Sequence, residues 1–214
     1  MNGTLYFSRN PNPRLAVAVA RHLQSQVAFE WAAPLAPGQA DKFRHLNPSL
    51  RLPILAEDGD TLWEADAIAC RLSQWHGSDF WRVGADMPDM IRWISWTRDH
   101  FMQACDMVHF ERGTKQRYNL GPVDQAVVAQ GLSLFHASAT VLETRLSQRP
   151  WLLASGLSYA DFRMATFLPF NDVARLPLRD YPAVEAWHRR LMSLPAWADP
   201  FAGLSAPALP PVPA

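Results

Sequence analysis

Cysteine, excess charge and long apolar runs are all scarce in this sequence. Its only cysteines are Cys70 and Cys105, too few for a disulfide framework, so we expect a reducing, cytoplasmic compartment. The 20 basic and 20 acidic residues balance and form no basic block, which argues against nucleic acid as a partner. There is no apolar run of about 18 residues, as a transmembrane helix needs. Residues 1–9 also lack the charged-then-apolar order of a signal peptide, so we expect no membrane partner.

Tryptophan and proline, by contrast, are abundant. The nine tryptophans predict bulky packing among helices, and the 18 prolines stand mostly at segment ends, where they interrupt regular structure. A chain of 214 residues is long enough to bury a core and fits one large domain or two small ones.

The first 78 residues alternate short strands with helices. Period-two and helical spacing predict strands at 3–8, 27–31, 52–56 and 61–63, and helices at 14–24, 39–46 and 65–76. Residues 57–60 have the composition of a hairpin turn. The order β-α-β-α-β-β-α, with Pro53 opening the third strand, predicts an α/β thioredoxin-like domain over 1–78.

The strand signal ends in a glycine- and proline-containing linker at 79–88. Long helices are then predicted at 89–112, 123–146 and 182–194, which makes 89–205 an all-α domain. Ser158 and Asp161 are spaced as a helix capping box, with aspartate in place of the usual glutamate. Residues 206–214 form a proline- and alanine-rich tail that we expect to be extended.

A series of motifs in the first domain resembles the glutathione-site signature of cytosolic glutathione transferases. The series is Asn47-Pro48, Leu52-Pro53-Ile54-Leu55, Asp58-Gly59 and Glu64-Ala65-Asp66-Ala67-Ile68. Leu5-Tyr6-Phe7-Ser8 and Asn12-Pro13-Arg14 are similar to the first strand and first helix of that family, and the Ser158–Asp161 box to its buried cap. The resemblance spans about residues 3–195 and is closest to serine-type bacterial members. It implies a homodimer that uses glutathione as co-substrate, without a metal.

The resemblance implies how the tripeptide is held. Pro53 would follow a cis bond, which presents the backbone of Leu52 to the cysteinyl part of glutathione like an added strand. Glu64 would pair with the γ-glutamyl ammonium. The backbone N–H of Ala65, at a helix start, would meet the γ-glutamyl carboxylate. The family has serine at the position of Ala65, so one hydroxyl that would hold this carboxylate is missing here.

The glycyl carboxylate and the thiol need further partners. Arg51 and Gln39 are candidates for the glycyl carboxylate. Since a free thiol is only a few per cent ionised at neutral pH, a donor must stabilise its thiolate. Counting back four residues from Arg14, Asn10 stands where serine-type members carry their serine, and Ser8 is the alternative. Tyr6 and Asn12 are further donors in the same region.

Other reactive residues have simpler interpretations. No cysteine lies in the loop around Ser8 to Asn12 and no Cys-x-x-Cys occurs, which argues against disulfide exchange by the protein's own thiols. Cys105 and His109 are spaced i, i+4 on a helix but have no evident third ligand, so they are predicted to be pocket or core residues, together with Trp96 and Met102, and not a zinc site.

The leading hypothesis is therefore an enzyme of detoxification that adds the thiolate of glutathione to a small, apolar electrophile. One alternative is a glutathione-binding or scaffold protein with little transferase activity. Another is a glutathione-dependent peroxidase, isomerase or lyase that uses the same site, because the second substrate decides the reaction.

Overall fold

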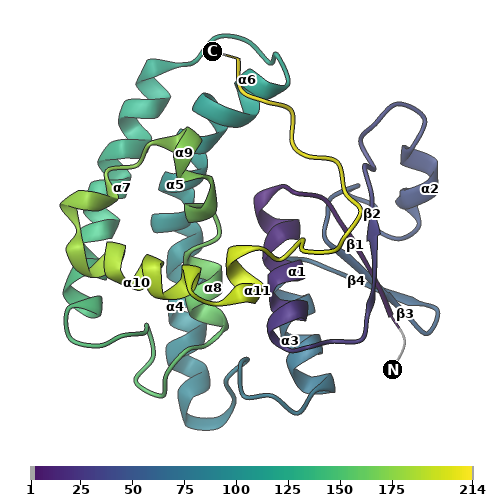
Figure 1. Ribbon diagram of the computed structural model, residues 1–214, viewed down its shortest axis with the longest axis horizontal. Coiled ribbons are helices and arrows are strands. Elements are labelled where there is room, and N and C mark those ends of the chain that lie inside the picture. Colours follow the sequence, from purple (N-terminus) through teal and green to yellow (C-terminus); the bar gives the residue numbers. More distant parts are fainter. Residues whose placement is uncertain (1–2, 214) are drawn as a thin grey trace. The chain divides into compact units, whose positions relative to one another are not determined.

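The computed structural model describes residues 3–213, which divide into two compact units (Figure 1). The N-terminal unit contains the described residues up to Trp81 together with Pro195–Ala208. The helical unit contains Arg82–Leu194 and the described residues from Leu209 onward. The predicted ranges 1–78 and 206–214 also include residues 1, 2 and 214, which lie outside the described residues.

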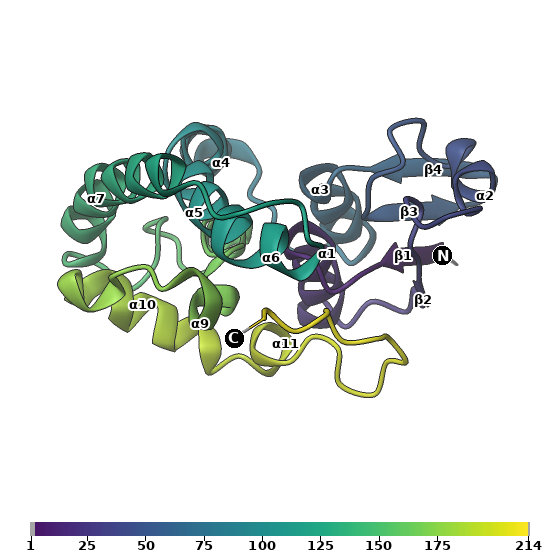
Figure 2. The same ribbon diagram turned by 90° about the horizontal axis from the view of Figure 1, so that it is seen from above.

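The N-terminal unit is built on a mixed sheet of four strands. These are β1 (Gly3–Phe7), β2 (Ala28–Trp31), β3 (Ile54–Glu57) and β4 (Asp60–Trp63), in the spatial order β2-β1-β3-β4. Strands β1 and β2 are parallel, while β3 is antiparallel to both of its neighbours. Helices α1 (Pro11–His22) and α3 (Ala65–Trp75) cover one face, and α2 (Ala40–Arg44) lies on the other (Figure 2). The predicted thioredoxin-like order of elements is confirmed.

Alternation along β1 explains which side chains each face of the sheet buries. A Cβ on Gly3 would lie 3.4 Å from the ring of Trp75 in α3, so Gly3, Leu5 and Phe7 point to the side of α1 and α3. Leu5 is fully buried there. Tyr6 points the other way and meets Phe43 of α2 edge-on, with ring centroids 5.9 Å apart.

The helical unit consists of helices joined by turns and loops. Its helices are α4 (Met87–Asp99), α5 (Phe101–His109), α6 (Lys115–Arg117), α7 (Gln125–Leu146), α8 (Tyr159–Met164), α9 (Asn171–Ala174) and α10 (Pro182–Met192). Three 3-10 turns (Gly84–Asp86, Leu168–Phe170 and Leu178–Asp180) and one π-helical turn (Phe110–Thr114) complete the unit. None of the helices found in residues 3–213 has the length and apolar character needed to cross a membrane.

The predicted helix 89–112 is wrong as a single element, because the chain breaks at His100. The backbone there has φ −131° and ψ −95°, outside the helical region, and separates α4 from α5. The His100 imidazole stacks on Trp96 at 4.9 Å, and its Nδ1 lies 2.8 Å from the Trp96 carbonyl oxygen. The side chain thus takes the acceptor that the His100 backbone N–H would use in a continuous helix, and that N–H donates to Thr97 instead.

The predicted capping box at the start of α8 is confirmed and is fully buried. One carboxylate oxygen of Asp161 accepts from the backbone N–H of Ser158 at 3.0 Å. The other accepts from the backbone N–H of Leu152 and from Trp187 Nε1, each at 3.0 Å. Burial raises the pKa of Asp161 to about 6, and these donors oppose that rise. Asp161 therefore ties three separate segments together.

The C-terminal part of the chain packs with the N-terminal unit, although residues up to 205 fall in the predicted helical domain. Helix α11 (Pro195–Ala198) carries Trp197, which is fully buried. The guanidinium of Arg14 donates to the Trp197 carbonyl and lies 4.9 Å from its ring. Phe201 then stacks on Phe7 with centroids 5.7 Å apart. These aromatic contacts account for the placement of 195–208.

Candidate functional site

The sheet register brings the predicted glutathione-binding segments to one end of the N-terminal unit. Tyr6 pairs with Ile54, which in turn pairs with Trp63. The segment that follows β1, the segment that precedes β3 and the segment that follows β4 therefore all leave the sheet at the same end. These segments carry Ser8 and Asn10, Arg51 to Pro53, and Glu64 and Ala65, respectively.

Ser8 and Asn10 form a hydrogen-bonded pair between β1 and α1. Asn10 Nδ2 donates to Ser8 Oγ at 3.2 Å. Asn10 immediately precedes α1, and its carbonyl accepts from the backbone N–H of Arg14 at 2.9 Å. Both side chains are half-buried. Because Ser8 Oγ accepts from the carboxamide, its own hydroxyl hydrogen can be donated to another group.

Asn47 shapes the loop that leads into β3. Its side chain is buried, donates from Nδ2 to the Arg51 carbonyl at 2.9 Å, and accepts from the backbone and hydroxyl of Ser49 at 3.0 and 2.8 Å. The peptide bond between Leu52 and Pro53 that follows is cis. Arg51 is exposed, Leu52 is half-buried and Pro53 is buried. The Asn47 amide thus supplies a structural reason for the first motif of the series.

Glu64 joins β4 to α3 in an unusual backbone conformation. Its φ is 75° and its ψ 128°, a region that favours glycine, and its side chain is exposed. Ala65 begins the helix and is buried. The first N–H groups of a helix have no acceptor within it, so this terminus can receive an anion. The methyl group of Ala65 is buried where the resemblance implies a hydroxyl.

Gln39 is the predicted ligand residue least connected to the others. The chain leaves β2 beside β1, where the Ala32 backbone N–H donates to the Phe7 carbonyl at 2.8 Å, and reaches Gln39 seven residues later. Gln39 immediately precedes α2, and its side chain is exposed. The structure brings Ser8 together with Asn10, but shows no hydrogen bond that links Gln39 to the other predicted site residues.

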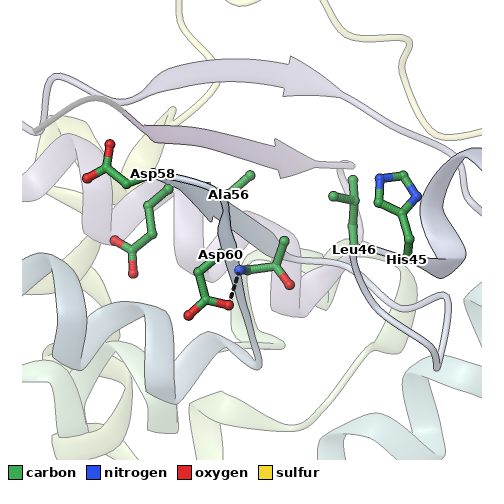
Figure 3. A pocket seen from close by; sticks show the side chains of 8 residues that line it. His45, Leu46, Ala56, Asp58 and Asp60 are labelled. Carbon is green, nitrogen blue, oxygen red and sulfur yellow. Dashed lines mark hydrogen bonds between the residues drawn. The ribbon is translucent and has the colours of Figure 1, made fainter.

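A shallow hollow of about 500 Å³ lies at the opposite end of β3 and β4 (Figure 3). His45, Leu46 and the hairpin residues 56–61 line it, and none of them is a predicted site residue. Among its carboxylates, Glu57 pairs with Arg71, and Asp60 accepts from the backbone N–H of Thr61 at 2.8 Å. These acids serve local structure, so we assign no chemistry to this hollow.

Cys105 and His109 lie in the core of the helical unit. Both are almost completely buried, and the His109 ring lies 5.5 Å from Phe167 and 5.2 Å from Phe170. Burial raises the pKa of the Cys105 thiol. Within residues 3–213, no group of three His, Cys, Asp or Glu side chains is arranged to hold a metal ion. Of the pocket and core interpretations, burial favours the core for these two residues.

His109 should make the protein sensitive to acid. Burial, with the nearby Arg117, lowers its pKa from 6.5 to about 4. Between these values the unfolded chain binds a proton that the folded chain excludes, so stability falls as the pH drops from 6.5 to 4. His109→Phe should remove about 3 kcal/mol of this loss. Urea unfolding of wild type and variant across this pH range measures the difference. The exposed His76→Phe is the control, and an identical pH slope for wild type and His109→Phe would refute the assignment.

Comparisons with known proteins give related families and structures. A family model described as the glutathione S-transferase C-terminal domain matches residues 125–190. FtsZ-localized protein A from Caulobacter vibrioides is 28% identical over 207 residues, which cover 90% of this chain and 87% of that protein. Glutathione S-transferase 2 from Schizosaccharomyces pombe is 26% identical over 222 residues, which cover 90% of this chain and 92% of the relative.

The solved structures show the same fold. Glutathione S-transferase I from maize, in complex with an atrazine glutathione conjugate, has a TM-score of 0.84 at 21% identity and covers 94% of this chain and 96% of its own. The matched C-terminal model, the curated relatives and the shared fold together support the glutathione S-transferase family for this chain.

Proposed function

We propose that the protein binds glutathione at the sheet end formed by the 8–10, 51–53 and 64–65 segments, and adds its thiolate to a small, apolar electrophile. The observation that carries the proposal is the cross-strand pairing of Tyr6 with Ile54 and of Ile54 with Trp63. This pairing makes the three segments leave the sheet at the same end. Proteins of the same fold support it, since the maize enzyme holds a glutathione conjugate and Ure2p was solved with glutathione.

Each part of the tripeptide has a partner of matching chemistry in this arrangement. The Leu52 backbone pairs with the cysteinyl unit as an added strand would. The exposed Glu64 carboxylate takes the γ-glutamyl ammonium, and the Ala65 N–H with the positive end of α3 takes the γ-glutamyl carboxylate. Arg51 or Gln39 takes the glycyl carboxylate.

The Ser8–Asn10 pair can stabilise the thiolate. With Asn10 Nδ2 donating to Ser8 Oγ at 3.2 Å, the Ser8 hydroxyl is oriented and its hydrogen can be donated to sulfur. Each unit by which the thiol pKa falls requires about 1.4 kcal/mol of preferential thiolate stabilisation. The thiol proton leaves to solvent, the sulfur attacks the electrophilic carbon, and the leaving group departs with its bonding electrons. Asn10 donates to sulfur directly if Ser8 is not the donor.

Two substitutions test whether this pair activates the thiol. Ser8→Ala and Asn10→Ala should each lower kcat/KM for glutathione and a chlorinated nitrobenzene by about 10- to 100-fold near neutral pH, because each removes or misorients a donor to the thiolate. The loss should shrink as the pH approaches the pKa of the free thiol. Asn12→Ala, in the first turn of α1, tests the further candidate donor, and the exposed His76→Phe is the control. If neither variant differs from wild type, the pair has no part in thiol activation.

A second candidate is a glutathione-binding or scaffold protein with little transferase activity. Ala65 lacks a hydroxyl for the γ-glutamyl carboxylate, and one relative of similar length is named FtsZ-localized protein A. Calorimetry with glutathione separates the candidates. Binding with turnover supports the transferase. Binding without turnover supports a glutathione-binding protein, and the absence of binding supports a scaffold. A homodimer in the cytoplasm and a role in detoxification complete the proposal, and sedimentation would test the dimer.

A further inference from the structure

A segment after α11 lies against the loop that carries Ser8 and Asn10. After α11, residues 199–208 run without regular secondary structure alongside the N-terminal unit (Figure 2). Phe201 is buried against Phe7, and Arg21 Nη2 donates to the Ala202 carbonyl at 2.9 Å. We call residues 201–206 the C-terminal strap.

Arg9 is the contact between the strap and the loop. Its guanidinium carbon lies 4.7 Å from the centre of the Phe201 ring, and its Nε donates to the Ala206 carbonyl at 3.4 Å. In the sequence Arg9 stands between Ser8 and Asn10. These two side chains bond to each other across it, so any displacement of the Arg9 backbone alters the geometry of their hydrogen bond.

The loop and the strap have few other constraints. The loop is only three residues long and lies between the end of β1 at Phe7 and the start of α1 at Pro11. The strap contains no helix or strand, and of its residues only Phe201 is buried. An arginine that stacks on an aromatic ring and donates to a carbonyl fixes both partners at once.

We propose that Arg9 is a positioning residue, which uses the C-terminal strap to hold the Ser8–Asn10 pair in the orientation that stabilises the thiolate of bound glutathione. The inference rests on the proposed function. It adds that residues almost 200 positions away from the loop in sequence set the acidity of the bound thiol. The strap acts on the pair through Arg9 and does not itself contact the sulfur.

The test compares four variants with the full chain. Arg9→Ala and a chain ending at Leu204 both remove the Arg9–Ala206 contact, and the shortened chain keeps Phe201. Arg9→Lys keeps the charge but not the planar stacking. A chain ending at Ala208 keeps the strap and is the control. Thiolate absorbance of bound glutathione against pH gives the thiol pKa, and calorimetry with S-methylglutathione measures tripeptide binding without a thiol.

We expect Arg9→Ala and the chain ending at Leu204 to raise the pKa of the bound thiol by about one unit, a tenfold loss of thiolate at low pH. Arg9→Lys should recover only part of this shift. Affinity for S-methylglutathione and the melting temperature should stay at the wild-type values, and the chain ending at Ala208 should match wild type throughout.

Other outcomes separate the two proposals. A wild-type thiol pKa in both Arg9→Ala and the chain ending at Leu204 overturns this inference and leaves the proposed function intact. A shift in Arg9→Ala alone shows that the Ala206 contact does not hold the pair, which also overturns the role given to the strap. If the wild-type protein binds neither glutathione nor its S-methyl derivative, the proposed function fails and the inference fails with it.

Discussion

Replacing Asp161 with alanine is expected to lower the free energy of unfolding by about 3–5 kcal/mol, a large part of the stability of an ordinary domain. The substitution leaves the backbone N–H groups of Leu152 and Ser158 and the indole N–H of Trp187 without their acceptor in a fully buried place. Chemical denaturation with matched m-values provides the measurement.

Two further variants localise the effect of Asp161. Asp161→Asn keeps one acceptor oxygen and should lose roughly half as much stability as Asp161→Ala. Trp187→Phe removes a single donor and should lose less than either. Ser205→Ala, on the surface, is a neutral control. If Asp161→Ala unfolded at the wild-type denaturant concentration, the buried carboxylate would not be the link between these segments.

Replacing Glu64 with glutamine is expected to weaken glutathione binding by about 30- to 100-fold, or 2–3 kcal/mol, because the γ-glutamyl ammonium loses a charged partner. Calorimetry measures the affinity. A glutathione analogue without the amino group supplies the control, since it should bind wild type and Glu64→Gln equally well. Equal affinity of both proteins for glutathione itself would remove Glu64 from the site.

The backbone conformation of Glu64 allows a second test, in which stability and glutathione binding should change in opposite directions. At φ 75° a glutamate is strained, whereas glycine is not. Glu64→Gly should therefore stabilise the fold by about 1 kcal/mol while abolishing the ammonium contact. Higher stability together with lost binding would indicate that the chain keeps a strained residue for its ligand. A destabilised Glu64→Gly variant would contradict that interpretation.

Local signals in the sequence predicted the elements well where neighbouring residues determine the structure. The turn at Asp58-Gly59 and the flanking alternation predicted the β3–β4 hairpin, and Ser158 with Asp161 predicted the start of α8. These features depend on hydrogen bonds and turns within a few residues. The predicted glutathione-binding segments have a different basis, because they follow from the resemblance of the motif series to a known family.

Contacts between distant residues could not be predicted from periodicity. The apolar spacing of 89–112 continues through His100, but the imidazole of that residue captures the Trp96 carbonyl and ends α4. The spacing of Trp187 predicts that it is buried, but not that it bonds to Asp161. Likewise, nothing local indicates that Phe201 stacks on Phe7. Periodicity predicts that a side chain is buried without naming its partner.

In the candidate site, too, some features could be predicted from the sequence and others depend on distant contacts. The residue types at 51–53 and 64–65 followed from the motifs, and sheet register explains why they converge. The Asn10–Ser8 hydrogen bond and the Arg9 contact to Ala206 depend on side-chain orientation and on a segment at the far end of the chain. The ligand roles assigned to these residues stay predictions until glutathione binding is measured.

The docking of Trp197 and Phe201 also affects the order in which parts of the chain can fold during synthesis. A nascent chain that has emerged only as far as the sheet and its helices leaves Arg14 and Phe7 without the aromatic rings that cover them. The N-terminal unit therefore completes its packing only after residues 195–208 have been synthesised, although most of it is synthesised first. A fragment cut near residue 81 would expose an uncovered cationic and aromatic surface, so functional dissection is better done by point substitution in the intact chain.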